Sequence, residues 1–320
     1  MTTGLCVIFN HPFKAQIPLL RELYGSRFGK LFFLHPLDRS AEAADVHVAY
    51  GGGFTFDAMI VSARERILQV FGDCDVVLFA HNDLLLTPKI SGSTFSTQYC
   101  LDAGTILIAG IGDLSATLNS WSWGFRAAVN WLQPRSLFAG GAEMAKSFLP
   151  SREEAQARAR ALGLSDTTAL LPASEEALTK LPPIFRTIHD DIFTKRAADG
   201  SLQPIDMGYP LFTGYCDFFA IPVPLLADWF DVLGPLSAMQ LFSEVAIPTG
   251  IALTAKRVIS LRDLGKGGQI LWGNERGTID DIKWVADRFN QGDVFIHPMK
   301  FNTFSDSYLA QLKEMYRGRP

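Results

Sequence analysis

A chain of 320 residues with 48% hydrophobic and 19% charged side chains can bury a substantial core, so an intrinsically disordered chain is excluded. Its formal net charge of −4 offers no general attraction for nucleic acid, and we expect no nucleic-acid partner. The four cysteines are dispersed without the spacing of a metal site, which is typical of reduced thiols packed in the interior.

Membrane and targeting signals are weak in this sequence. It does not begin with a basic segment followed by a long apolar run, which predicts a cytoplasmic protein. The long apolar stretch at residues 216–242 contains three aspartates and three prolines, which a membrane-spanning helix would tolerate badly. We therefore expect no transmembrane segment, while peripheral association with the inner face of a membrane remains compatible with the sequence.

The first part of the chain alternates apolar runs with amphipathic segments. Apolar runs at 5–9, 30–34 and 46–50 predict buried strands, and the segments 13–24 and 55–71 have helical periodicity. Strands that alternate with helices are typical of a parallel sheet with right-handed crossovers.

The fourth apolar run, at residues 76–86, is interrupted by His81, Asn82 and Asp83. A buried strand is expected to end there, because three consecutive polar side chains must leave the core. In an open α/β sheet, ligands bind at the carboxyl ends of the strands. We therefore predict that Asp83 holds a metal-bound diphosphate, with a polar turn between two strands as the alternative.

Residues 90–205 depart from this alternation. They first mix Ser, Thr and Gly and then become charged and alanine-rich, and Ser151 and Glu154 have the spacing of a helix capping box. We predict that 90–205 is an inserted, partly helical cap subdomain within a single domain of residues 1–320. The cap would carry substrate specificity in one interpretation and be purely structural in the other.

Acidic and basic side chains recur where the later apolar segments begin or end. Asp217 precedes a predicted strand at 218–221, and Glu244 lies in an otherwise apolar predicted helix. A last predicted strand at 294–296 is followed by His297 and Lys300. The motifs GxSxG and HExxH are absent, so the common serine hydrolases and zinc proteases have no local support.

The order of these features resembles glycosyltransferases of the GT-A fold, which use nucleotide-diphosphate sugars. The segments 214–248 and 295–300 are similar to a subgroup of bacterial glycosyltransferase-like proteins. The resemblance covers about residues 1–88 and 205–305. It implies a Rossmann-related α/β fold, in which helices flank a mostly parallel mixed sheet, and a role in polysaccharide biosynthesis.

The resemblance also implies a divalent cation, Mn²⁺ or Mg²⁺, held by Asp83 and His297. Asp83 matches the last acid of the DxD-type motif of the family, whereas His81 stands where that motif has its first Asp. Losing one carboxylate weakens the case for a hard cation, because such ions prefer oxygen ligands. The nitrogen of His297 would suit Mn²⁺ better than Mg²⁺.

Two acids are the catalytic residues that the resemblance implies. Glu244 would be the general base that deprotonates the acceptor hydroxyl, and direct displacement would then invert the anomeric centre. Asp217 would accept hydrogen bonds from a sugar. The alternatives are that Glu244 pairs with an arginine or a helix end and that Asp217 caps the backbone. The residues expected to bind the nucleotide or its diphosphate are Asn10, His11, Arg64, Asn82 and Lys300.

We therefore expect a glycosyltransferase that moves a sugar from a nucleotide-diphosphate donor to a hydroxyl group of a glycan or glycolipid acceptor. Two alternatives stay open. One is a non-catalytic nucleotide-sugar or glycan-binding module with a degenerate metal site, for which His81 in place of an acid is the observation. The other is a metal-dependent nucleotidyl or phosphoryl transferase on a similar sheet.

Overall fold

The computed structural model describes residues 1–51, 55–117, 123–134, 140–180, 183–193, 202–271 and 279–317. The chain forms two compact units, each built from separate segments. Unit 1 contains Met1–Ala109, Asp217–Leu226 and Ile259–Pro320, and unit 2 contains Gly110–Cys216 and Ala227–Val258. The predicted cap at 90–205 lies largely within unit 2, and its status as an insertion into one domain stays a prediction.

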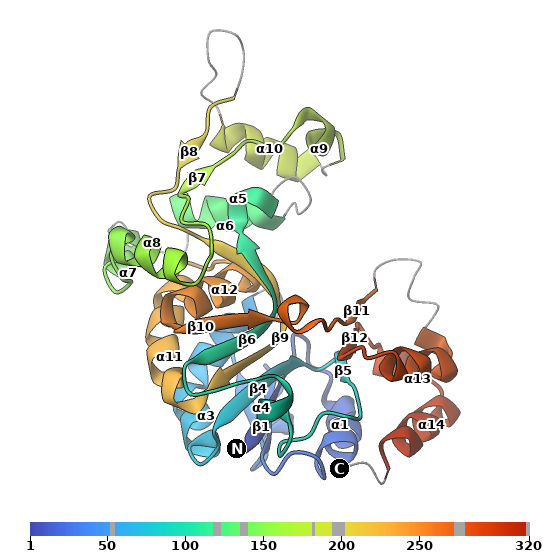
Figure 1. Ribbon diagram of the computed structural model, residues 1–320. Coiled ribbons are helices and arrows are strands. Elements are labelled where there is room, and N and C mark those ends of the chain that lie inside the picture. The colour runs from blue at the N-terminus through green and yellow to red at the C-terminus, as the bar shows by residue number, and fades with distance from the viewer. Residues whose placement is uncertain are drawn as a thin grey trace. The chain divides into compact units, whose positions relative to one another are not determined.

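The main sheet has seven strands in the order β10-β6-β9-β4-β1-β2-β3 (Figure 1). Their bounds are Thr3–Ile8 (β1), Leu31–Pro36 (β2), Val46–Ala49 (β3), Val76–His81 (β4), Thr105–Asp113 (β6), Phe212–Pro222 (β9) and Arg257–Ser260 (β10). Strand β1 pairs in parallel with β2 and β4, β2 pairs in parallel with β3, and β9 is antiparallel to β4. The predicted α/β class with a mostly parallel mixed sheet is therefore confirmed.

The central strands form where the sequence is continuously apolar. Every residue of β1 and β4 is buried, as expected for parallel strands that are covered on both faces. A second, three-stranded sheet has the order β11-β12-β5, in which β11 is parallel and β5 antiparallel to β12. Its strands are Leu85–Leu86 (β5), Gln269–Ile270 (β11) and Phe295–His297 (β12).

The helices of unit 1 include those predicted at 13–24 and 55–71. They are Ile17–Tyr24 (α1), Phe56–Ser62 (α2), Arg64–Phe71 (α3), Phe95–Gln98 (α4), Ile282–Asn290 (α13) and Asp306–Tyr316 (α14). The predicted helix at 55–71 is two helices, because the backbone of Ala63 leaves the helical region, with φ −94 and ψ 8. The Ser62 hydroxyl donates to the Met59 carbonyl, a contact that bends helices.

Unit 2 is mostly helical. Its helices are Leu114–Thr117 (α5), Trp123–Leu132 (α6), Gly141–Lys146 (α7), Arg152–Ala161 (α8), Glu175–Lys180 (α9), Pro183–Ile192 (α10) and Ser243–Thr254 (α12), together with most of Val223–Ala238 (α11). Ala169–Leu170 (β7) and Ile205–Asp206 (β8) pair as antiparallel strands. The predicted capping box at Ser151 and Glu154 is present at the start of α8.

Small side chains bring two helices of unit 2 together. Helix α8 packs against α12 (Figure 1). Ala159 of α8 and Ala252 of α12 form a buried cluster with Phe212. Within the described parts of both units, no helix combines the length and the apolar character needed to cross a bilayer.

Candidate metal centre

The polar interruption at residues 81–83 forms a tight turn at the carboxyl end of β4. His81 is the last residue of β4 and pairs with Ile8 of β1, whose carbonyl accepts from the Asn82 amide at 2.8 Å. The Leu84 amide then donates to the His81 carbonyl at 3.1 Å, and the chain continues into β5. This turn directs both His81 and Asp83 to one side, so that Nδ1 of His81 lies 2.8 Å from Oδ1 of Asp83.

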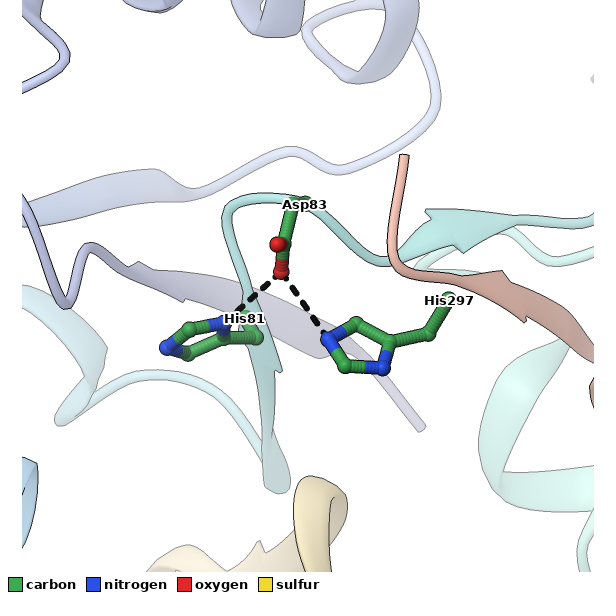
Figure 2. Close-up of side chains that lie close together, drawn as sticks. All are labelled: His81, Asp83 and His297. Atoms are coloured by element: carbon green, nitrogen blue, oxygen red, sulfur yellow. Dashed lines mark hydrogen bonds and ion pairs between the residues drawn. The ribbon is translucent and has the colours of Figure 1, made fainter. Parts of the chain in front are cut away.

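His297 reaches the same carboxylate from the far end of the sequence. It ends β12, whose Ile296 pairs with Leu85 of β5, and the Met299 amide donates to the Asp83 carbonyl at 2.6 Å. As a result, Nε2 of His297 lies 3.1 Å from Oδ1 of Asp83. Figure 2 shows the Asp83 carboxylate between the two imidazole rings. We call His81, Asp83 and His297 the His-Asp-His group; all three are buried.

Two further charged side chains adjoin this group. Nζ of Lys300 lies 2.6 Å from Oδ2, the other carboxylate oxygen of Asp83. Oδ2 of Asp217 lies 3.8 Å from Nε2 of His297. Asp217 precedes Phe218, which pairs with Ala80, so the same antiparallel register places Asp217 opposite the end of β4. The structure therefore brings together Asp83, His297, Lys300 and Asp217.

The charges of the group support one another. Burial alone would lower the pKa of His81, but its hydrogen bond to Asp83 and the charges of Asp83 and Asp217 raise it above the usual value. Burial would likewise raise the pKa of Asp83, yet hydrogen bonds from His297 and His81 and their positive charge hold it well below its usual value. A carboxylate only accepts hydrogen bonds, so both contacting nitrogens donate to Asp83 in the absence of a metal.

The donor set fits a divalent transition-metal ion. One atom from each residue of the His-Asp-His group lies within 4.8 Å of the other two. Adjacent ligands at bond lengths of about 2.1 Å and right angles are separated by about 3.0 Å, close to the measured 2.8 and 3.1 Å. Two imidazoles and one carboxylate favour Mn²⁺, Fe²⁺ or Zn²⁺ over Mg²⁺, which requires oxygen ligands.

His81 was not among the metal ligands expected from the sequence. In the comparison with a DxD-type motif, His81 stands in the place of a missing acid. In the structure, its ring nitrogen is positioned as a possible metal ligand. The signal that would have found it is its spacing from Asp83, because residues two apart at a strand end share one side.

Two of the other predicted binding residues, Asn82 and Arg64, have local partners. Asn82 is 1% exposed, and its side-chain nitrogen Nδ2 donates to Oε1 of Gln16 at 2.7 Å. Arg64, the first residue of α3, pairs with the adjacent Glu65 at 3.0 Å. Asn10 is half-buried and His11 is exposed, in the segment that follows β1. Their predicted roles in nucleotide binding stay predictions.

Glu244 is the second residue of α12. A carboxylate in the first turn of a helix is stabilised by the positive end of the helix dipole, as the alternative interpretation of this residue expected. Glu244 belongs to unit 2, whereas the His-Asp-His group belongs to unit 1. Its predicted role as the general base therefore stays a prediction.

Buried tyrosines hold the segment that follows Asp83. The Tyr24 hydroxyl accepts from the Leu86 amide at 3.2 Å and lies 3.3 Å from the Leu84 carbonyl. The hydroxyl of Tyr316, from α14, donates to the Leu86 carbonyl. Both side chains are almost fully buried. This arrangement has no signal in the sequence, because neither tyrosine is close to Leu86 along the chain.

Comparison with known proteins gives remote structural similarity without sequence matches. No protein-family model matches the sequence, and no curated protein matches it. Among solved structures, the bifunctional glycosyltransferase WbbM in its apo form aligns with a TM-score of 0.36 and 10% sequence identity. The alignment covers 100% of this chain and 50% of WbbM, so this chain spans half the length of that structure.

Proposed function

We propose that this chain is a metal-dependent glycosyltransferase, which moves a sugar from a nucleotide-diphosphate donor to a hydroxyl group of a glycan or glycolipid acceptor. The observation that supports it most is the buried His-Asp-His group at the end of β4, with Lys300 on the same carboxylate. A metal site and an ammonium group side by side suit a diphosphate, whose negative charge grows as the sugar departs.

Each residue of the site has a role in this proposal. Oδ1 of Asp83, Nδ1 of His81 and Nε2 of His297 would hold the ion, and Mn²⁺ fits this set better than Mg²⁺. When bound, the ion would neutralise charge on the diphosphate. Lys300 would donate to a phosphate oxygen, and Asp217 would accept hydrogen bonds from sugar hydroxyls.

The remaining predicted residues complete the proposal. Glu244 would deprotonate the acceptor hydroxyl, which gives an inverting transfer. The residues proposed to contact the nucleotide or its diphosphate are Asn10, His11, Arg64 and Asn82. The proposal includes a single GT-A-like domain, in which residues 90–205 form the cap, and an enzyme of polysaccharide biosynthesis on the cytoplasmic side.

The contact of His81 with Asp83 argues against a degenerate metal site. The imidazole that replaces an acid remains within hydrogen-bonding distance of the carboxylate, where it supplies a ligand atom. In a module that had lost its metal, we would not expect three buried polar side chains to stay in contact, because such groups are costly to bury.

Nucleotide binding tests the proposal. Calorimetric titration with UDP, GDP, CDP, ADP and dTDP, each with and without Mn²⁺, should find at least one that binds in a Mn²⁺-dependent manner. Asp83→Asn should weaken that binding by roughly 10²-fold, since it removes the only anionic ligand of the group. Asp73→Asn is the matched control, because Asp73 is an exposed carboxylate of unit 1. If no nucleotide binds, or if both variants behave alike, the proposal is wrong.

Reaction products separate the transferase classes. A glycosyltransferase releases a nucleoside diphosphate from a nucleotide-sugar donor. A nucleotidyl transferase instead releases pyrophosphate from a nucleoside triphosphate, and a phosphoryl transferase moves the terminal phosphate of a nucleoside triphosphate to its acceptor. Glu244→Gln should leave donor binding unchanged and lower turnover by roughly 10²-fold, as expected for loss of a positioned base. Glu143→Gln, at an exposed position, should retain full turnover. Unchanged turnover in Glu244→Gln would remove this residue from the mechanism.

A further inference from the structure

Two cavities of unit 2 meet at the same pair of residues. Their volumes are about 430 and 450 Å³, and both are lined by Leu149 and Pro150. Each volume lies within the range of small-ligand sites, which is about 300–1,000 Å³. We call the first the acidic cavity and the second the aromatic cavity. The acidic cavity is lined by Phe148, Glu154, Arg158, Asp228, Asp231 and Thr254. The aromatic cavity is lined by Trp131, Lys146, Ser147, Arg152 and Tyr209.

The walls of the acidic cavity come from helices that present polar groups on one face. Glu154 and Arg158 are one turn apart on α8, and Asp228 and Asp231 are three residues apart on α11. The Arg158 guanidinium donates to the Leu253 carbonyl near the end of α12, which fixes its direction. The cavity therefore offers oriented donors and acceptors.

Phe148 adds an apolar surface beside these polar groups. It is 71% exposed, a high value for a large aromatic side chain, and it lines the acidic cavity. A pyranose ring has an apolar face made by its C–H groups and an edge of hydroxyls. An exposed aromatic ring next to carboxylates and a guanidinium matches both features of such a ring.

The aromatic cavity combines two buried aromatic rings with basic side chains. The rings of Trp131 and Tyr209 lie 5.2 Å apart, and Nζ of Lys146 lies 4.6 Å from the centre of the Trp131 ring. Trp131 donates to the Met207 carbonyl at 2.8 Å, and the Tyr209 hydroxyl donates to the Pro150 carbonyl at 3.0 Å. These bonds fix the shared wall, so both cavities are set before any ligand arrives.

The ionic side chains of the two cavities balance. Taken together, the two cavities are lined by three acids, Glu154, Asp228 and Asp231, and by three bases, Arg158, Lys146 and Arg152, so their formal charges add to zero. Such a lining does not select a strongly charged ligand, and its many hydrogen-bonding groups favour one rich in hydroxyls.

We propose that unit 2 binds an uncharged oligosaccharide, with neighbouring sugars in the acidic and aromatic cavities on either side of Leu149 and Pro150. The inference deepens the proposed function by naming the chemical class of the acceptor. It rests on that function only for the role of the bound chain as acceptor, because the binding site itself needs neither metal nor nucleotide.

Direct binding to the full chain tests this site. Calorimetric titrations without metal or nucleotide would use cellohexaose, maltohexaose, chitohexaose and a hexamer of α-1,6-mannose, with hexagalacturonate as the charged comparison. At least one neutral hexasaccharide should bind, and more tightly than hexagalacturonate. If no neutral hexasaccharide binds, or if hexagalacturonate binds more tightly than all of them, the proposal is overturned.

Matched variants locate the binding. Phe148→Ala should weaken the affinity by roughly 3- to 10-fold, the scale of one aromatic contact. Asp228→Asn should weaken it by roughly tenfold through loss of a charged acceptor. The controls are Ile184→Ala and Asp191→Asn, which alter exposed residues of unit 2 outside both cavities. Affinities that are equal in all four variants would place the sugar elsewhere and overturn the proposal.

The outcome is separable from that of the proposed function. Mn²⁺-dependent nucleotide binding without oligosaccharide binding would keep the transferase and remove this site. Oligosaccharide binding that responds to Phe148→Ala, in a chain that binds no nucleotide, would support this site and contradict the transferase. Thermal unfolding of each variant shows whether a lost affinity reflects the cavity or a lost fold. Because Asp228→Asn is nearly isosteric and lies at an exposed position, this variant should have the same unfolding temperature as the wild type.

Discussion

Replacing Lys300 by glutamine should have opposite effects on metal and nucleotide. The ammonium group lies 2.6 Å from Oδ2 of Asp83, while the two histidine nitrogens contact Oδ1. In the free protein this ammonium repels a second cation at the same carboxylate. With a diphosphate present it becomes a favourable partner. Lys300→Gln should therefore tighten Mn²⁺ binding in the absence of nucleotide and weaken nucleoside diphosphate binding in the presence of Mn²⁺.

The size of the first effect follows from Coulomb's law. An ion on Oδ1 would lie roughly 6 Å from Nζ, given the 2.6 Å contact to Oδ2 and metal–oxygen bonds of about 2 Å. The Lys300 side chain is 41% exposed but Asp83 is buried, so the dielectric constant of water gives the lower limit of the repulsion. At this distance, a charge of two repelled by a charge of one costs about 1.4 kcal/mol, which corresponds to a tenfold tighter Mn²⁺ site in the variant.

Calorimetric titration of Mn²⁺ into wild type and variant at low ionic strength would measure this effect. Lys30→Gln is the control, because Lys30 is a lysine of unit 1 whose side chain is about as exposed as that of Lys300 and which pairs with Asp73. The gain in affinity should shrink as salt is added, since exposed charges are screened. Mn²⁺ affinity that is unchanged or weaker in Lys300→Gln would refute a metal ion on the carboxylate of Asp83.

Mn²⁺ affinity should rise with pH, because the pKa of His81 is raised above its usual 6.5 and the ion must displace that proton. The expected change is up to about tenfold per pH unit below the folded pKa of His81, and an affinity flat between pH 6 and 8 would exclude His81 as a ligand. The stability of the metal-free protein should instead fall as the pH rises. The protonated ring of His81 stabilises the fold fully below about pH 6.5, and this contribution is lost as the pH rises through the raised pKa. Thermal unfolding measured between pH 6 and 9 should therefore show declining stability. Tyr316→Phe should lower the free energy of unfolding by about 1–3 kcal/mol, because the buried Leu86 carbonyl loses its donor, and Mn²⁺ affinity should fall with it. The exposed Tyr50→Phe should change neither quantity, and normal Mn²⁺ affinity in Tyr316→Phe would restrict that tyrosine to a role in stability.

The sheet could be predicted because its central strands are buried on both faces. A run such as residues 76–81 is then apolar throughout, and polar side chains mark its end. Strand direction has no such local signature, so the antiparallel placement of β9 against β4 came only from the structure. The break at Ala63 was also hidden, because the apolar periodicity continues through both helices.

The candidate site could be predicted in part for the same reason. Asp83, Asp217, His297 and Lys300 all lie next to ends of apolar runs, and strand pairing brings those ends together. His81 was not predicted as a metal ligand, because only its residue type was compared with the acid of the motif. Its spacing of two residues from Asp83, which suits a pair of ligands, was not considered. The supporting tyrosine Tyr316 could not be inferred, since its contact with Leu86 spans 230 residues.

The separation along the chain of the two halves of the metal centre has a consequence for folding. Asp83 and Lys300 are 217 positions apart, and the last ligand arrives with β12. On the ribosome, β1 to β4 emerge long before that strand, so the carboxylate of Asp83 is made well ahead of one of its two imidazole partners. Closing so long a loop is slow, and it is completed only when β12 docks against β5. A metal ion that needs both histidines would therefore bind after this docking and would hold together the earliest and latest parts of the nascent chain.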